Sequence, residues 1–394
     1  MEYTLSPSVT IINNRQVLVS SSSPSPANDR RRRRRRRRSN GILHFPFVFS
    51  GLSLRFRSRA VVVAGAGSYG GYGSGGGSYC EFSCLNTPIE PATPAGRYLS
   101  SVLLNERKLF HDAVAETLEK LVKEVDEAYA RKALTVDSSE AALHRRIAEL
   151  KQQECKTSVE DVMYMLIFYK FSELRVHLVP PLSKCIYNNR LEILPSKDWE
   201  LESIHSFEIL EMIKEYLTFV IGWRSDFSVT ESWATTKIKQ ANLCHIYTTS
   251  ILFGYFLKST TLRHQLEMSL ADPIDDIIMN AYICRRKNLV FGHTHNKIPT
   301  SPFDGKRERE NLVSYLTGFT SDSLAKCAQP NSKEALNLIT KYSFALFGDV
   351  GSDKMISTSF ATLKRLVLEA VAFGSFLWDS EEYVKTVYNL EEIN

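Results

Sequence analysis

Residues 253–257 are Phe-Gly-Tyr-Phe-Leu, and residues 373–377 are Phe-Gly-Ser-Phe-Leu. Each copy of this F-G-x-F-L pattern comes late in a long apolar segment with helical periodicity. A glycine inside a helix costs about 1 kcal/mol relative to alanine, so its presence in both segments needs a packing reason. We interpret it as a close approach of two helices at equivalent positions of a weak internal repeat. The pattern predicts an all-α fold of two packed helical units.

Apolar residues at three- and four-residue spacing extend the helical prediction to most of the chain. An amphipathic stripe covers residues 109–129, and a narrower one consists of Leu143, Ile147 and Leu150. Further helices are expected at residues 207–221, 236–268, 334–347 and 357–387. No strong strand signal accompanies them, which again favours an all-α protein.

Residues 159–175 form the most apolar of the predicted helices. Thr157 and Glu160 match a capping box, so the helix is expected to begin at Val159. Its apolar side chains occur nearly all round, as expected of a helix in a core. By contrast, residues 269–308 contain several prolines and aspartates and are expected to form a long surface loop.

Charge is distributed unevenly along the chain. Residues 1–80 contain thirteen arginines, no lysine and two acidic residues, so they carry +11. The whole chain carries +5, which leaves −6 for residues 81–394. This acidic remainder argues against broad binding to nucleic acid, which needs clustered lysine and arginine. No stretch approaches eighteen uninterrupted apolar residues, so we expect no membrane span.

The leader, residues 1–64, is rich in serine and arginine, as is typical of a transit peptide. Processing is expected near Ala60–Ala64. We therefore predict a disordered transit peptide that directs the protein to the chloroplast stroma. A mitochondrial location is a weaker alternative. The nine arginines at 30–38 also allow a nuclear localisation or nucleic-acid patch, so a nuclear basic protein stays open as an alternative.

Gly65, Gly67 and Gly70 follow a short apolar run and match G-x-G-x-x-G. A dinucleotide site needs these glycines to open a helix, but the chain continues with Gly71-Tyr-Gly-Ser-Gly-Gly-Gly-Ser78. Such a sequence does not support a helix. We therefore interpret residues 65–95 as a disordered Gly/Pro-rich linker, and we predict no bound cofactor.

The seven cysteines are scattered and odd in number, and no C-x-x-C pair occurs. This pattern is typical of reduced, mostly buried thiols rather than a disulfide framework. Cys80 and Cys84 lie close together in the linker, so a redox-active pair of these two thiols stays open as an alternative.

Two groups of residues resemble metal sites. Glu202 and His205 form an E-x-x-H pair, but a di-iron bundle needs two such pairs and two more glutamates. His293 and His295 could join acidic residues and Cys284 around zinc, yet their spacing matches no closed zinc site. In both cases we favour the structural interpretation, so no metal ligand is assigned.

No nucleophile elbow, P-loop or Cys/His pair in a recognisable context occurs, so no catalytic residue is assigned. A catalytic site assembled only by the fold remains open, because its residues need not be neighbours in sequence. The alternative is thus an enzyme or a cofactor or metal carrier with a site between the helical units. We favour protein binding or regulation, with unidentified protein partners; the oligomeric state stays open.

Several segments resemble the UV-B-induced chloroplast proteins of plants, which are built from a domain of unknown function. The segments that carry this resemblance are 143–150 (LHRRIAEL), 159–171 (VEDVMYMLIFYKF), 180–206 (PPLSKCIYNNRLEILPSKDWELESIHS), 233–236 (WATT), 251–267 (ILFGYFLKSTTLRHQLE) and 364–379 (KRLVLEAVAFGSFLWD). The resemblance implies a plastid location, a helical fold and a link to UV-B or other stress. It supplies no reaction, cofactor or site residue. We expect one helical unit at 96–222 and a second at 233–392.

Overall fold

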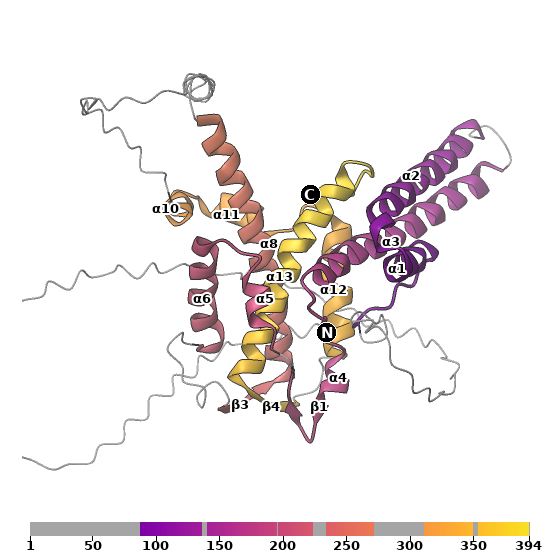
Figure 1. Cartoon of the computed structure of the whole chain (residues 1–394). Coiled ribbons are helices and arrows are strands. Elements are labelled where there is room, and N and C mark those ends of the chain that lie inside the picture. The colour runs from indigo at the N-terminus through magenta and orange to yellow at the C-terminus, as the bar shows by residue number, and fades with distance from the viewer. Residues whose placement is uncertain are drawn as a thin grey trace, which may run out of the picture. The chain divides into compact units, whose positions relative to one another are not determined.

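A computed structural model describes residues 87–135, 140–194, 196–223, 234–271, 311–349 and 354–393. Within these residues the protein is mostly helical, which confirms the predicted fold class (Figure 1). The elements in chain order are α1 (Pro94–Asn105), η2 (Arg107–Leu109), α2 (Phe110–Leu134), α3 (Ala141–Glu173), α4 (Leu182–Cys185), β1 (Ile186–Tyr187), β2 (Arg190–Leu191), α5 (Asp198–Glu202), α6 (Phe207–Ile221), β3 (Thr235–Lys239), α8 (Gln240–Ala271), α10 (Leu312–Thr317), α11 (Ser321–Ala328), α12 (Lys333–Phe347), β4 (Met355–Ser359) and α13 (Phe360–Lys385).

Helices α8 and α13 pack together at the two F-G-x-F-L segments. A Cβ atom added to Gly254 would lie 2.8 Å from the Cα of Val371, and closer still to its carbonyl oxygen. A Cβ added to Gly374 would meet the backbone of Ile251 in the same way. Only glycine allows this approach, because a real Cβ would overlap the facing backbone. The close approach of two helices at these glycines, which was inferred from sequence, is therefore confirmed.

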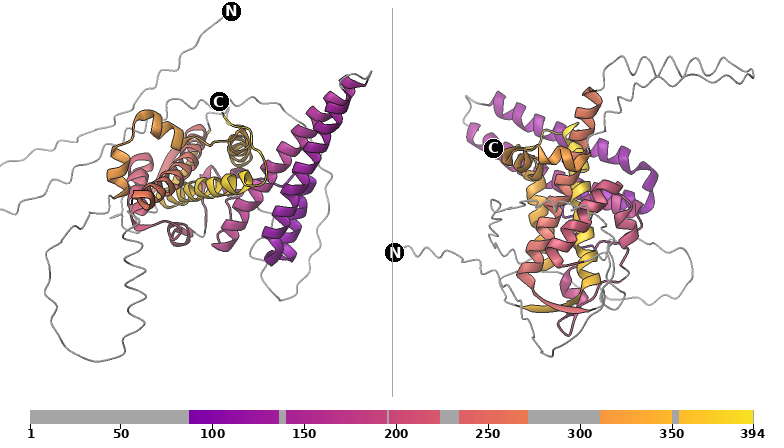
Figure 2. Two further views of the ribbon diagram at one scale, coloured as in Figure 1. Left: turned by 90° about the horizontal axis from the view of Figure 1, so that it is seen from above. Right: turned by 90° about the vertical axis from the view of Figure 1, so that its left-hand side faces the viewer.

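Each of these two helices follows directly on a strand. β3 and β4 pair antiparallel, with Lys237 opposite Ser357 at the centre of the register. The sequence offset that relates Lys237 to Ser357 also relates Gly254 to Gly374. Strand and helix thus repeat together about a pseudo-twofold axis, and Figures 1 and 2 show both helices rising side by side from the strands. The internal repeat is a β–α unit.

The strands were not predicted. The helices expected at 236–268 and 357–387 begin only at Gln240 and Phe360, and their first residues form β3 and β4. A sheet with the order β1-β2-β4-β3 results, in which β2 and β4 run parallel. β-branched and hydroxyl side chains in TTKIK and MISTS favour an extended backbone once a partner strand is present.

Helix α3 is continuous through the predicted capping box, so that prediction was wrong. Thr157 does not cap a helix; its hydroxyl donates to the Gln153 carbonyl one turn earlier, at 3.0 Å. Glu160 instead accepts a hydrogen bond from Asn337 of α12 at 3.1 Å. The second half of α3 is buried almost all round, as predicted. It packs against α1, α2, α12 and α13.

Other boundaries agree more closely. Helix α6 covers the predicted residues 207–221, and α12 begins one residue before the prediction. Helix α1 begins inside the predicted linker, at Pro94, where Thr93 caps it. Helix α8 continues to Ala271, so the predicted loop begins later than residue 269. The leader 1–64, most of the linker and the remainder of the loop lie outside the described residues.

None of the helices in the described ranges combines the length and the hydropathy that a membrane span requires. The four cysteines in this part of the chain are free thiols. Cys155, Cys244 and Cys327 are buried, and burial raises the pKa of Cys155 and Cys244. These four agree with the reduced state predicted from sequence.

Candidate functional site

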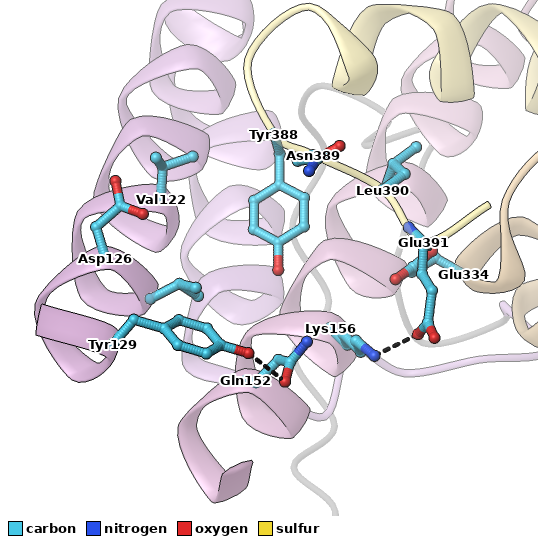
Figure 3. A pocket seen from close by; sticks show the side chains of 11 residues that line it. Val122, Asp126, Tyr129, Gln152, Lys156, Glu334, Tyr388, Asn389, Leu390 and Glu391 are labelled. Carbon is cyan, nitrogen blue, oxygen red and sulfur yellow. Dashed lines mark hydrogen bonds and ion pairs between the residues drawn. The ribbon is translucent and has the colours of Figure 1, made fainter. Parts of the chain in front are cut away.

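An open crevice of about 430 Å³ separates the α2–α3 pair from the C-terminal segment, residues 388–391. Figure 3 shows side chains from both sides directed toward it. Its lining residues are Val122, Val125, Asp126 and Tyr129 of α2, Gln152 and Lys156 of α3, Glu334 of α12, and Tyr388, Asn389, Leu390 and Glu391. The crevice therefore combines residues from both predicted helical units.

Hydrogen bonds fix the two walls of the crevice. On one wall, the Tyr129 hydroxyl of α2 donates to the side-chain carbonyl of Gln152 on α3 at 2.8 Å. On the other, the C-terminal segment is held to the start of α12, where the Lys333 amide donates to the Glu391 carbonyl at 2.9 Å. The Glu391 amide in turn donates to the carboxylate of Glu334 at 3.2 Å. These hydrogen bonds join α2 to α3 on one wall and the C-terminal segment to α12 on the other.

The Glu391 carboxylate ties the C-terminal segment to two helices. It pairs with Lys156 of α3, and the Lys333 ammonium reaches its second oxygen at 2.8 Å. Hydrogen bonds from these two lysines lower the pKa of Glu391 to about 2, and the bond from Lys156 has the larger effect. Glu391 therefore stays ionised at neutral pH and links the two sides of the crevice.

Two further side chains that line the crevice have raised pKa values. Glu334 is 2% exposed, and burial raises the pKa of its carboxyl group. Burial likewise raises the pKa of Tyr388 to about 12, so its hydroxyl keeps its proton at neutral pH. Figure 3 shows the Tyr388 ring between α2 and the Lys156–Glu391 pair, with its hydroxyl directed toward Gln152.

The crevice carries more negative than positive charge. Asp126 and Glu391 are exposed carboxylates on its lining, whereas Lys156 is the one basic residue among its lining residues. Tyr129 is 41% exposed and adds an aromatic ring beside Asp126, and the Lys132 ammonium lies 5.4 Å from the centroid of this ring. Carboxylates next to an aromatic ring suit a guanidinium or ammonium group. The arrangement can therefore hold a cationic group.

The E-x-x-H pair has a structural explanation. The Glu202 carboxylate of α5 forms an ion pair with the Lys364 ammonium of α13 at 2.9 Å. The Asp198 carboxylate pairs with the same ammonium at 3.1 Å. Burial lowers the pKa of His205 to about 4, so its imidazole is neutral. Within the described part of the chain, no three His, Cys, Asp or Glu side chains are grouped as metal ligands would be.

Two fully buried glutamates of α13 were missed from sequence. Glu369 pairs with Arg365 one turn earlier at 2.8 Å, and both its oxygens accept from the Val179 amide at 3.2 Å. Glu381 accepts from the Ser332 amide at 2.6 Å. Each carboxylate holds a connecting segment against the core, as expected of buried charges that are paired or hydrogen-bonded. The Arg365–Glu369 spacing was a sequence signal for one of them.

Other candidates from sequence lie outside the described residues. These are the glycines of the G-x-G-x-x-G match (Gly65, Gly67, Gly70), the thiols of Cys80 and Cys84, and the possible zinc ligands Asp272, Asp275, Asp276, Cys284, His293 and His295. Conversely, none of the residues that line the crevice was predicted from sequence to belong to a functional site. Its central ion pair joins Lys156 to Glu391, which only the tertiary fold brings together.

Fold and site together define a mostly helical protein in which a β–α repeat supports an open, acidic crevice. The chain is 32% identical over 328 residues to a UV-B-induced chloroplastic protein of Arabidopsis thaliana, covering 77% of each chain. Residues 142–270 match a family described as proteins of unknown function, DUF760. The chain therefore belongs to the family of UV-B-induced chloroplast proteins, which confirms the resemblance found in its sequence. No solved structure matches it.

Proposed function

We propose that this chain is a UV-B-responsive protein of the chloroplast stroma that acts by binding a protein partner. Its Arabidopsis relative is UV-B-induced and chloroplastic, and the two chains correspond over 77% of their lengths. The arginine- and serine-rich leader supports the same compartment. Binding is favoured over catalysis because the Lys156–Glu391 ion pair lies at the crevice, and its lining residues in the described part of the chain include no activated nucleophile.

One observation carries the choice of ligand, namely the excess of carboxylates over basic groups in the crevice. Three of its lining residues are acidic, Asp126, Glu334 and Glu391, and one is a lysine, Lys156. Glu391 is paired with Lys156 and also with Lys333, which does not line the crevice. A guanidinium group can bind a carboxylate through two hydrogen bonds and stack on the Tyr129 ring. The crevice accordingly binds an arginine or lysine side chain presented by the partner.

The test uses residues 65–394 and the double variant Asp126→Asn, Glu391→Gln. Acetyl-arginine amide is titrated into each protein, and binding is followed by NMR signals of tyrosine side chains. The wild type is expected to show saturable shifts with a dissociation constant of about 1 mM, as for a single anchoring group. The double variant should lose them, because both carboxylates are replaced by neutral amides of similar shape.

Glu116→Gln is the matched control, since Glu116 is an exposed carboxylate of α2 that does not line the crevice. It should bind the probe as the wild type does. The same three proteins are then immobilised and exposed to stroma from plants kept with and without UV-B. A protein captured by wild type and control, but not by the double variant, supports the proposal. Equal probe binding by all three proteins overturns it.

A further inference from the structure

The distal part of the α2–α3 hairpin has no buried core of its own. We call it the distal arm and define it as residues 129–135, at the C-terminal end of α2, and residues 140–150, at the N-terminal end of α3. Ala148 is its one buried residue, and every other described residue of the arm is at least partly exposed. Figure 2 shows α2 and α3 extending beyond the remaining helices. Two helices in water gain most of their stability from packing, so an arm of this kind is poorly stabilised alone.

Three apolar side chains form an uncovered stripe on this arm. Leu143, Ile147 and Leu150 are 58%, 45% and 50% exposed. Their spacing of four and three residues places them on one face of α3, as in the seam of a coiled coil. That face differs from the one that packs on α2, where Ala148 and Cys155 are buried. Leu134, at the end of α2, is 85% exposed and adds to the apolar surface of the arm.

The stripe is self-complementary. Leu143 and Leu150 flank Ile147, so an antiparallel second stripe would place leucine against leucine and isoleucine against isoleucine. Residues 129–150, which include the arm, contain four basic and three acidic side chains, so their net charge is only +1. A nearly neutral surface neither strongly repels an identical copy nor selects a strongly charged partner. The chemistry of the stripe therefore favours a second copy of the same chain.

From these observations we infer that two copies of this protein associate through their distal arms. The α3 helices lie antiparallel with Ile147 at the twofold axis, and the two hairpins form a four-helix bundle. Closed twofold pairing of one surface with itself is the commonest way in which identical chains assemble. Antiparallel four-helix packing is an established arrangement for two hairpins of this length. The assembly buries the stripe that the single chain leaves in water.

The position of Ile147 at the axis allows a specific experiment. The full chain is studied by sedimentation equilibrium as wild type, Ile147→Glu and Ile147→Lys. The wild type is expected to form dimers with a dissociation constant of about 10 μM. Each variant places two like charges against each other, so each should be monomeric, with association weakened at least about tenfold. Mixing the two variants should restore a dimer, because glutamate then faces lysine.

Leu266→Glu is the matched control. Leu266 is 59% exposed on α8, outside the arm, so this variant should dimerise as the wild type does. Circular dichroism checks that all variants keep their helical content. A monomeric wild type at about 100 μM would overturn the inference, given the affinity expected of such an interface. So would a dimer that survives Ile147→Glu, or a mixture of the two variants that stays monomeric. None of these outcomes depends on the crevice, so they leave the proposed function to its own test.

Discussion

Gly254 and Gly374 each face the backbone of the other's helix where α8 and α13 cross. A Cβ on Gly374 would lie 2.8 Å from the Tyr255 amide nitrogen, and one on Gly254 would overlap Val371 similarly. The hydroxyl of Ser375 bridges the same crossing by donating to the Gly254 carbonyl at 3.2 Å. The two glycines thus set the separation of the central helices, and they occupy equivalent positions of the β–α repeat.

Gly254→Ala should destabilise the protein, although alanine is the better helix former by about 1 kcal/mol. The added methyl group meets backbone atoms, which cannot move away as a side chain could. We expect a loss of about 3 kcal/mol in the free energy of unfolding, measured by urea denaturation. Gly318→Ala is the control, since its Cβ would lie 3.4 Å from the nearest atom, the Tyr315 carbonyl oxygen. An unchanged stability of Gly254→Ala would contradict this account of the crossing.

Ser332→Ala should cost more stability than Ser359→Ala. Both serines cap helices, with the Ser332 hydroxyl accepting from the Ala335 amide and the Ser359 hydroxyl from the Thr362 amide. Ser332 alone also donates to the buried Glu381 carboxylate. Losing a cap costs about 1 kcal/mol, and losing a bond to a buried charge adds about 2 kcal/mol. Thermal unfolding of the two variants measures the difference, and equal effects would mean that the Glu381 contact contributes nothing.

His205 should make the stability of the fold depend on mild acid. Its pKa is about 4 in the folded protein because burial disfavours the charged imidazole, against 6.5 as the unperturbed value. The unfolded chain therefore binds the proton first, and stability falls as the pH drops below 6.5 until the folded pKa is passed. The loss by pH 5 is about 2 kcal/mol.

The comparison for this prediction is His205→Gln, studied by denaturation at pH 7 and pH 5. The variant should lose less stability between the two pH values than the wild type does. His245→Gln removes an exposed histidine of α8 and serves as the control. A wild type and a His205→Gln variant with parallel pH profiles would show that His205 is not the group responsible.

Lys156→Met distinguishes a cation site from an anion site in the crevice. Lys156 competes with an incoming guanidinium group for Glu391, so its removal should strengthen binding of acetyl-arginine amide. We expect a gain of up to about fivefold, since partly exposed ion pairs contribute up to about 1 kcal/mol. Methionine keeps most of the length and volume of the side chain. If the probe binds less well, or if inorganic phosphate binds to the wild type and not to the variant, the crevice is an anion site.

The helices that form one wall of the crevice could be predicted from sequence. The stripe over residues 109–129 predicted α2, and the apolar run to residue 175 predicted the buried half of α3. The polar lining could not be predicted, because Asp126, Gln152 and Glu391 resemble ordinary surface residues in the linear chain. Glu391 in particular lies beyond the last predicted helix, and its acidity depends on lysines from α3 and α12.

The sequence by itself determined the helical class, most helix positions and the glycine crossing, because periodicity and helix propensity are properties of neighbouring residues. Its resemblance to the UV-B-induced chloroplast proteins also came from local segments. Only the tertiary structure decided that β3 and β4 are strands, because each needs the other's backbone hydrogen bonds. It alone brought Lys156 to Glu391 and buried Glu369 and Glu381. Those contacts join residues that the sequence keeps apart, and their energies arise only when water is excluded between them.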